Sequence, residues 1–155
     1  MIQRKQSLYL LSSVIICVIT FFLPLGFISG ESVIRYSVCG FFNHESGEMV
    51  QFNWMLSAVL TIVLILQTVS IFLFNNRIRQ AMMVQVSLIL LLVFVVLALL
   101  HQDITSLLSK TEMPEKEIEF NWNIILIAVA WIFTYLALRA IKKDEALVRS
   151  TDRMR

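Results

Sequence analysis

Four long apolar stretches dominate the pattern of hydrophobic and polar positions along the chain. Each runs for roughly 20 residues without Asp, Glu, Lys or Arg, which is enough for a helix to cross the ~30 Å hydrocarbon layer of a membrane. A helix also satisfies its own backbone hydrogen bonds where water is absent. We therefore predict an all-α membrane protein. Its single domain, residues 1–155, has transmembrane helices at about 8–28, 54–74, 81–100 and 122–141 and a tail at 142–155.

The composition agrees with this pattern. Hydrophobic residues make up 58% of the chain and charged residues 15%, against about 45–50% and 25% in ordinary soluble domains. A soluble enzyme is effectively excluded. With only two cysteines, Cys17 and Cys39, a disulfide scaffold is excluded as well.

The first stretch raises the alternative of a cleaved signal peptide, because Arg4 and Lys5 precede it. It is longer than the 7–15 residues of a signal core, and no A-x-A-like cleavage site follows it. We interpret it as a retained helix in which Pro24, close to the outer end, causes only a mild kink.

Basic residues are distributed unevenly between the two ends of the predicted bundle. Ten of the thirteen Lys and Arg residues fall in the N-terminus, the loop at 75–80 and the tail, whereas eight of the eleven acidic residues fall in the other two loops. The excess of Lys and Arg predicts that both termini face the cytoplasm.

The first outer loop, residues 29–53, alternates apolar and polar positions on both sides of a turn-rich segment at Asn43–Gly47. This pattern predicts a short β-hairpin. The loop ends in Gln51-Phe52-Asn53-Trp54, which is echoed by Glu119-Phe120-Asn121-Trp122. The echo indicates either a duplicated two-helix unit or, as we favour, interfacial Trp anchors with Asn caps at two helix starts.

The four stretches contain no Asp, Glu, Lys or His, so ion-coupled transport is not expected. Three mild polar residues, Gln67, Gln85 and Thr134, are candidates for an interhelical polar layer, in which Gln67 and Gln85 could meet across the short hairpin. The layer would either hold helices together, which we favour, or bind a substrate.

The C-terminal tail is charged and helix-favouring. It predicts contact with anionic lipid or with a partner protein. The candidate residues are Arg139, Lys142, Lys143, Asp144, Glu145, Arg149, Asp152 and Arg153.

Chemistry-bearing residues are confined to the outer side, where His44, His101 and Asp103 lie. Their spacing matches no zinc motif, and no nucleophile motif is present. We expect no enzyme activity, no cofactor, no metal and no nucleic-acid partner.

Three segments, MIQRKQSLYLL, IFLFNNRIRQ and LALRAIKKDEALVRSTDRMR, resemble a family of four-helix membrane proteins from Bacteroidota known only as a domain of unknown function. The resemblance implies a bacterial inner membrane with a periplasm outside, and it implies no activity. We hypothesise an accessory or scaffold subunit of a membrane complex, associating with the bilayer and with a membrane-protein partner or further copies of itself. The alternative is a small-molecule or lipid transporter or binding protein that uses the polar layer.

Overall fold

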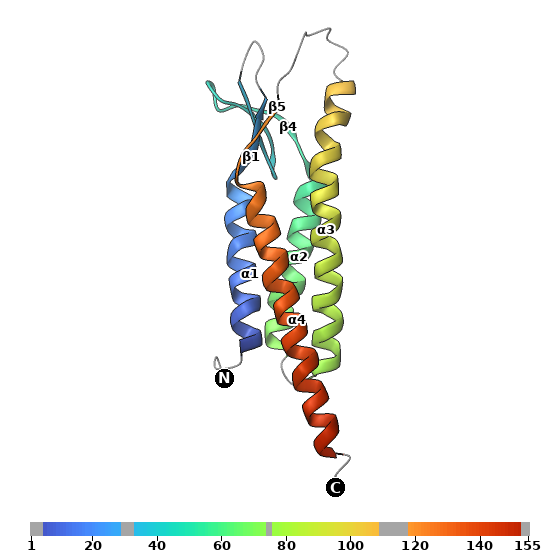
Figure 1. The fold of residues 1–155 in the computed structure, drawn as a ribbon. Coiled ribbons are helices and arrows are strands. Elements are labelled where there is room, and N and C mark those ends of the chain that lie inside the picture. Colours follow the sequence, from blue (N-terminus) through green and yellow to red (C-terminus); the bar gives the residue numbers. More distant parts are fainter. Residues whose placement is uncertain (1–4, 29–32, 74–75, 109–117, 153–155) are drawn as a thin grey trace.

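The computed structural model describes residues 5–28, 33–73, 76–108 and 118–152, and in them the chain forms a helical bundle with a small sheet at one end (Figure 1). The predicted combination of four helices with a small antiparallel β-structure is confirmed. The helices are α1 (Lys5–Phe22), α2 (Trp54–Phe72), α3 (Arg77–Leu108) and α4 (Ile124–Asp152). The strands are β1 (Pro24–Ile28), β2 (Ile34–Ser37), β3 (Gly40–Asn43), β4 (Met49–Phe52) and β5 (Ile118–Phe120).

The first apolar stretch divides into a helix and a strand, which corrects the prediction of one helix over residues 8–28. Helix α1 ends at Phe22 and β1 begins at Pro24. Proline has no backbone N–H and disfavours the helical conformation of the residue before it. Pro24 therefore ends the helix instead of kinking it, and the apolar residues after it form strand β1.

Helices α3 and α4 also differ from their predicted limits. Helix α3 runs from Arg77 to Leu108, beyond the predicted 81–100, and α4 runs from Ile124 to Asp152, beyond the predicted 122–141. Charged residues mark the end of an apolar span but do not stop a helix, because Arg, Lys and Glu are good helix formers. Most of the predicted tail is therefore a continuation of α4.

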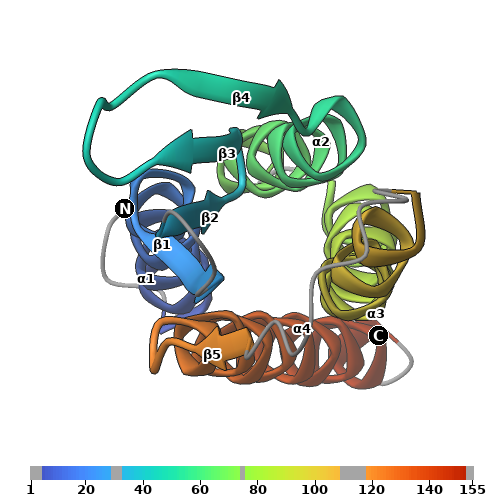
Figure 2. The same cartoon turned by 90° about the horizontal axis from the view of Figure 1, so that it is seen from above.

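The predicted β-hairpin is part of a larger antiparallel sheet in the order β4-β3-β2-β1-β5. The hairpin prediction paired the segments of β2 and β4 directly, but β3 lies between them. Residues 24–28 and 118–120 add two more strands, β1 and β5. Viewed along the bundle, the strands lie over the ends of α2, α1 and α4 (Figure 2). The sheet thus joins the α1–α2 and α3–α4 connections into one layer.

The sheet packs on the bundle through Tyr36, Val38 and Phe41, which are buried in one core cluster with helix residues such as Leu56 and Phe94. The Tyr36 hydroxyl donates a hydrogen bond to the carbonyl oxygen of Ala98 in α3, at 3.3 Å. Burial raises the pKa of Tyr36 well above its ordinary value, so the phenol remains a hydrogen-bond donor. This contact joins the sheet to α3, the helix over which Figure 2 shows no strand.

The two Asn-Trp segments do not cap helices in the predicted way. Asn53 makes no side-chain capping hydrogen bond, and its amide nitrogen lies 3.5 Å from the carbonyl oxygen of Ser37. Helix α4 begins at Ile124, two residues after Trp122, and Asn123 donates to the carbonyl oxygen of Pro24 at 2.9 Å. Asn53 and Asn123 therefore fasten the sheet to the helix starts.

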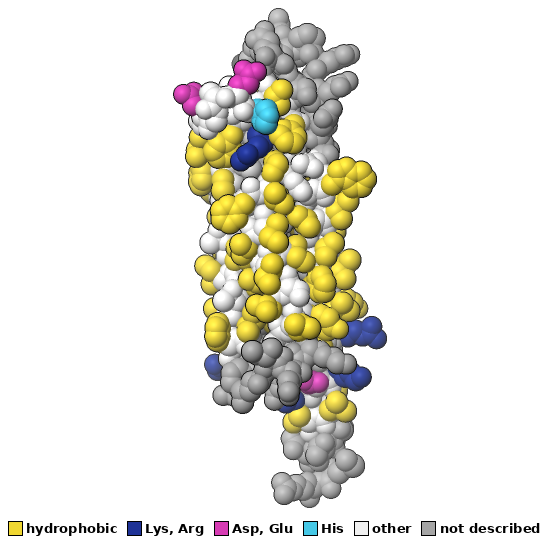
Figure 3. Space-filling view, turned by 90° about the vertical axis from the view of Figure 1, so that its left-hand side faces the viewer, with side chains coloured by type: hydrophobic (Ala, Val, Ile, Leu, Met, Phe, Trp, Pro, Cys, Tyr) yellow, Lys and Arg dark blue, Asp and Glu magenta, His cyan; other side chains and the backbone are white. Residues whose placement is uncertain are grey.

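Among the described residues, three helical segments are long and apolar enough to cross a membrane: Trp54–Phe72, Arg77–Leu100 and Ile124–Val148. The apolar part of α1, Gln6–Phe22, is shorter. In Figure 3, hydrophobic side chains cover most of the visible bundle between acidic side chains at the sheet end and basic ones at the opposite end. The described chain begins and ends at that opposite end (Figure 1).

Gly40 allows β3 and β4 to approach closely, which leads to a first prediction. A Cβ at position 40 would press on the Gln51 carbonyl oxygen and lie 3.2 Å from the Phe52 Cα. We expect Gly40→Ala to lower the free energy of unfolding by about 1–3 kcal/mol, as overpacking does. Thermal unfolding in detergent, followed by circular dichroism, measures the loss.

Gly47→Ala is the matched control for this substitution. Its Cβ would meet nothing within 4 Å, but Gly47 has a φ of 70°, so alanine there should cost only about 1 kcal/mol. If Gly40→Ala is as stable as the natural protein, the close approach of β3 and β4 is not required.

Candidate functional site

Three buried polar side chains from three helices meet inside the bundle at the Thr134 hydroxyl. The Ser13 and Thr134 hydroxyl oxygens are 2.8 Å apart, and the Gln67 amide nitrogen donates to Thr134 Oγ1 at 3.0 Å. Ser13 belongs to α1, Gln67 to α2 and Thr134 to α4, and all three side chains are fully buried. We call these three residues the hydroxyl cluster.

The hydroxyl cluster includes one backbone acceptor. The Ala130 carbonyl oxygen lies 2.8 Å from Thr134 Oγ1 and 3.1 Å from Ser13 Oγ. Ser13 and Thr134 each have one hydroxyl proton. These two protons are available for three close contacts, which join Ser13 Oγ, Thr134 Oγ1 and the Ala130 carbonyl oxygen. The Gln67 carbonyl oxygen, Oε1, is buried without a hydrogen-bond partner. The cluster thus holds an open acceptor and no charge, which suits it to joining helices and not to acid–base chemistry.

The structure brings together only two of the three residues predicted for the polar layer. Gln67 and Thr134 are bonded, whereas Gln85 is exposed on α3. The prediction that Gln67 and Gln85 meet is wrong because it rested on their depth along the helices and not on the direction each faces around the helix axis. Ser13 takes the third place. Its position in a stripe of small residues with Cys17 and Thr20 was the available signal, since such stripes mark close helix packing.

A second polar group lies at the end of the bundle opposite the sheet and involves Asp144. The Gln6 side-chain amide donates to the Asp144 carboxylate, and Arg77 Nη1 donates to the Asp144 backbone carbonyl oxygen at 3.0 Å. Gln6 lies on α1 and Arg77 on α3, so Asp144 ties α4 to both. We call Gln6, Arg77 and Asp144 the terminal cluster; its Gln6 and Arg77 were not anticipated from the sequence.

The other tail residues are placed as follows. Arg139, Lys142 and Lys143 are exposed, and Glu145 is half-buried. Arg149 and Asp152 belong to α4, but their side chains, like the whole of Arg153, lie outside the described residues. The exposed residues leave three positive charges on the surface of α4 beside the terminal cluster.

The sheet end of the bundle presents His44 in an exposed turn and Cys39 in a partly buried position. Burial raises the pKa of the Cys39 thiol, which lowers its thiolate fraction at neutral pH and its nucleophilicity. The side chains of His101 and Asp103 lie outside the described residues. In the part of the chain that the structure describes, no group of three or more His, Cys, Asp or Glu residues could hold a metal ion.

Comparison with known proteins shows that the chain belongs to one family over nearly all of its length. The family model described as a domain of unknown function (DUF4293) matches residues 2–154. A comparison with curated proteins finds no match. The expected relationship to a family of unknown function is confirmed, whereas the link to Bacteroidota stays a prediction.

The hydroxyl cluster leads to a second prediction. Thr134→Val removes the acceptor of Gln67 and leaves a buried amide unpaired, which should cost about 1–3 kcal/mol. Gln67→Leu removes the amide donor together with its unpaired oxygen and should cost less. The double variant should therefore be more stable than Thr134→Val alone. Unfolding in mixed micelles of increasing dodecyl sulfate content measures each free energy.

Gln85→Leu is the matched control, since it makes the same change on an exposed position and should shift stability by no more than about 0.5 kcal/mol. Equal stability of Thr134→Val and the natural protein would contradict a structural role for the cluster.

Proposed function

Given that the chain belongs to the DUF4293 family of domains of unknown function, we propose that it is a four-span protein of the bacterial inner membrane with both termini in the cytoplasm. We further propose that it serves as a non-catalytic accessory or scaffold subunit of a membrane complex. The extension of α4 beyond its neighbouring helices is the observation that carries this function.

The surface supports membrane insertion. Beside the three long apolar segments, α1 has 18 residues, about 27 Å at 1.5 Å per residue, so a slight thinning of the bilayer accommodates it. Trp54 and Trp122 are strongly exposed at the sheet end of α2 and α4. Such tryptophans are typical of the membrane interface.

The charge distribution supports the orientation. The end opposite the sheet carries Arg77, Arg79 and the basic residues of α4, and the turn between β3 and β4 carries the exposed Glu45 and Glu48. Lys and Arg accumulate on the cytoplasmic side of membrane proteins. The sheet then faces the periplasm.

The extension of α4 supports a docking role. Helix α4 has 29 residues, which corresponds to about 44 Å, more than the ~30 Å of the hydrocarbon layer. Helices α1 and α3 reach only as far as Asp144 through Gln6 and Arg77. Beyond that level Ala146, Leu147 and Val148 are all exposed, and Figure 1 shows the helix projecting from the bundle. A helix with exposed Leu and Val beside lysines suits a protein partner.

The alternative of a transporter or lipid-binding protein draws on the unpaired Gln67 oxygen alone. The other members of the hydroxyl cluster bond to one another or to a backbone carbonyl, and Gln85 faces outward. This arrangement favours a structural bundle over a polar pathway.

Orientation gives a third prediction. In a variant with Cys17 and Cys39 replaced by serine, single cysteines are introduced as Ser46→Cys or Lys143→Cys, both at exposed positions. We expect a membrane-impermeant maleimide added to intact spheroplasts to label position 46 and not position 143. Labelling of position 143 instead would reverse the orientation, and detergent lysis, after which both react, is the control.

Docking gives a fourth prediction. The chain is tagged at its N-terminus, expressed in its source membrane and compared with a form ending at residue 145, which keeps the terminal cluster intact. We expect a stoichiometric partner to co-purify with the full chain and to be lost from the shortened one. A Leu147→Glu/Val148→Glu variant should lose it as well, because charge disfavours burial of that face.

Recovery of the full chain alone in mild detergent, or of the same partner with both forms, would contradict docking through α4. Equal amounts of both forms in the membrane, seen by immunoblotting, show that shortening has not impaired folding.

A further inference from the structure

A small pocket opens on the sheet, away from the hydroxyl cluster and from the α4 extension. It has a volume of about 110 Å³ and is lined by Arg35, Phe42, Asn43, His44 and Gly47. A water molecule occupies roughly 30 Å³ in the liquid, so the pocket has room for a small polyatomic group. Its residues come from β2, from β3 and from the turn after β3.

Arg35 is the charged group of the pocket, and one of its donors has no hydrogen-bond partner in the part of the chain that the structure describes. Its Nε is buried without a hydrogen-bond partner. The guanidinium carbon lies 5.6 Å from the centre of the Phe42 ring, and Arg35 and Phe42 are paired across β2 and β3. The Phe42 ring holds the guanidinium through a cation–π contact. The ring accepts none of the hydrogen bonds that the guanidinium can donate in the guanidinium plane.

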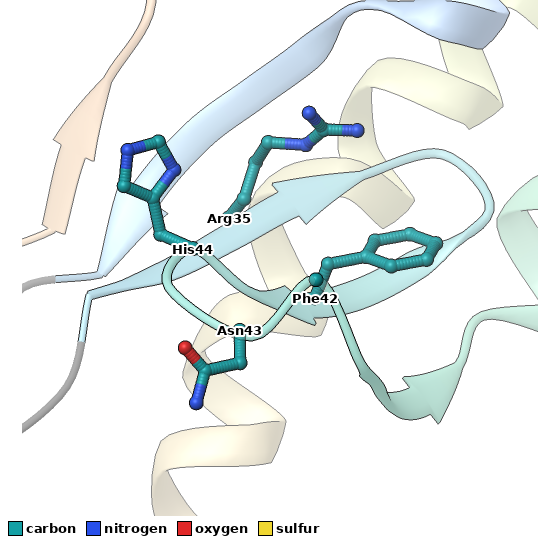
Figure 4. A pocket seen from close by; sticks show the side chains of 5 residues that line it. Arg35, Phe42, Asn43 and His44 are labelled. Carbon is teal, nitrogen blue, oxygen red and sulfur yellow. The ribbon is translucent and has the colours of Figure 1, made fainter.

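His44 supplies a second polar group on the same side. In Figure 4 the Arg35 and His44 side chains rise on one side of the strands, while Asn43 points to the other. The His44 and Phe27 rings form a T-shaped pair, with centroids 6.0 Å apart. The Asn43 side-chain oxygen accepts from the Glu45 backbone N–H at 3.0 Å, so it serves the turn.

We propose that this pocket binds a phosphate group, with the Arg35 guanidinium as the principal donor and His44 as the second. A guanidinium presents paired N–H donors that match the oxygens of phosphate. The Phe42 ring restricts the rotation of the guanidinium and does not compete with a ligand for the N–H donors in the guanidinium plane.

The position of the pocket limits where the phosphate comes from. In the space-filling view a basic side chain and a histidine lie together where the hydrophobic surface meets the acidic side chains of the sheet end (Figure 3). In a membrane-spanning chain this level corresponds to the lipid headgroups. A lipid headgroup and a soluble phosphate compound offer the same group, so the experiment must separate them.

The test uses the full-length protein in a neutral maltoside detergent. Inorganic phosphate is titrated calorimetrically against sulfate-free chloride buffer of equal ionic strength. Short-chain phosphatidylglycerol and the matching diacylglycerol, which lacks the phosphate, are compared by native mass spectrometry. Binding of inorganic phosphate without the phospholipid identifies a soluble phosphate compound as the ligand, and binding of the phospholipid without inorganic phosphate identifies a headgroup. Binding of both shows a phosphate site that accepts either source.

Variants assign the binding to the pocket. Arg35→Gln should weaken it about tenfold or more, the effect of losing hydrogen bonds to a charged group, and His44→Gln should weaken it about threefold. Arg79→Gln makes the same charge change on the exposed side of α3 and should leave it unchanged.

Absence of binding to both probes, or binding that Arg35→Gln leaves intact, would overturn the proposal. Where Arg35→Gln fails to fold, Arg35→Lys decides instead, since it keeps the charge and loses the paired donors. A phosphate site that depends on the guanidinium is weakened by this change, whereas general attraction to positive charge is not.

Discussion

The bundle depends on hydrogen bonds made where water is scarce, and the Thr134 hydroxyl is the point at which three helices share them. Between apolar helices in a membrane there is little hydrophobic drive for association, because lipid tails are as apolar as Leu. Specific contacts must therefore select the arrangement. Ser13 and Gln67 both reach Thr134, which fixes the rotation of α1, α2 and α4 about their axes. With those rotations fixed, Gln6 also faces the Asp144 side of α4.

Pro24 sets the second constraint, because the C-terminal end of the first apolar stretch forms a strand from this residue onward. Strand β1 then has two free edges, and β2 and β5 pair with them. The sheet that results pairs backbone groups of both connections at this end of the bundle, and unpaired buried N–H and C=O groups are costly. Strand β1 also supplies Phe27, whose ring contacts His44 of the pocket.

Composition and periodicity in the sequence predict where helices and strands lie. They do not predict which side of a helix a residue faces or which distant segments pair. Apolar length identified the helices, and alternation around the Asn43–Gly47 turn identified β-structure. Gln85 was misplaced because depth along a helix does not define the side it faces. Strands β1 and β5 were missed because pairing between residues 24–28 and 118–120 leaves no local signal. The terminal cluster was missed for the same reason, since Gln6 and Asp144 are far apart in the chain.

The terminal cluster bears on what the α4 extension can do. A free charged tail loses conformational entropy when it binds a partner, and that loss offsets part of the contact energy. In this chain Gln6 and Arg77 hold α4 at Asp144, immediately before the exposed residues Ala146 to Val148. The extension therefore leaves the bundle as a helix whose direction is already set by α1 and α3. A partner would meet an ordered surface, and less conformational entropy would be lost when it binds.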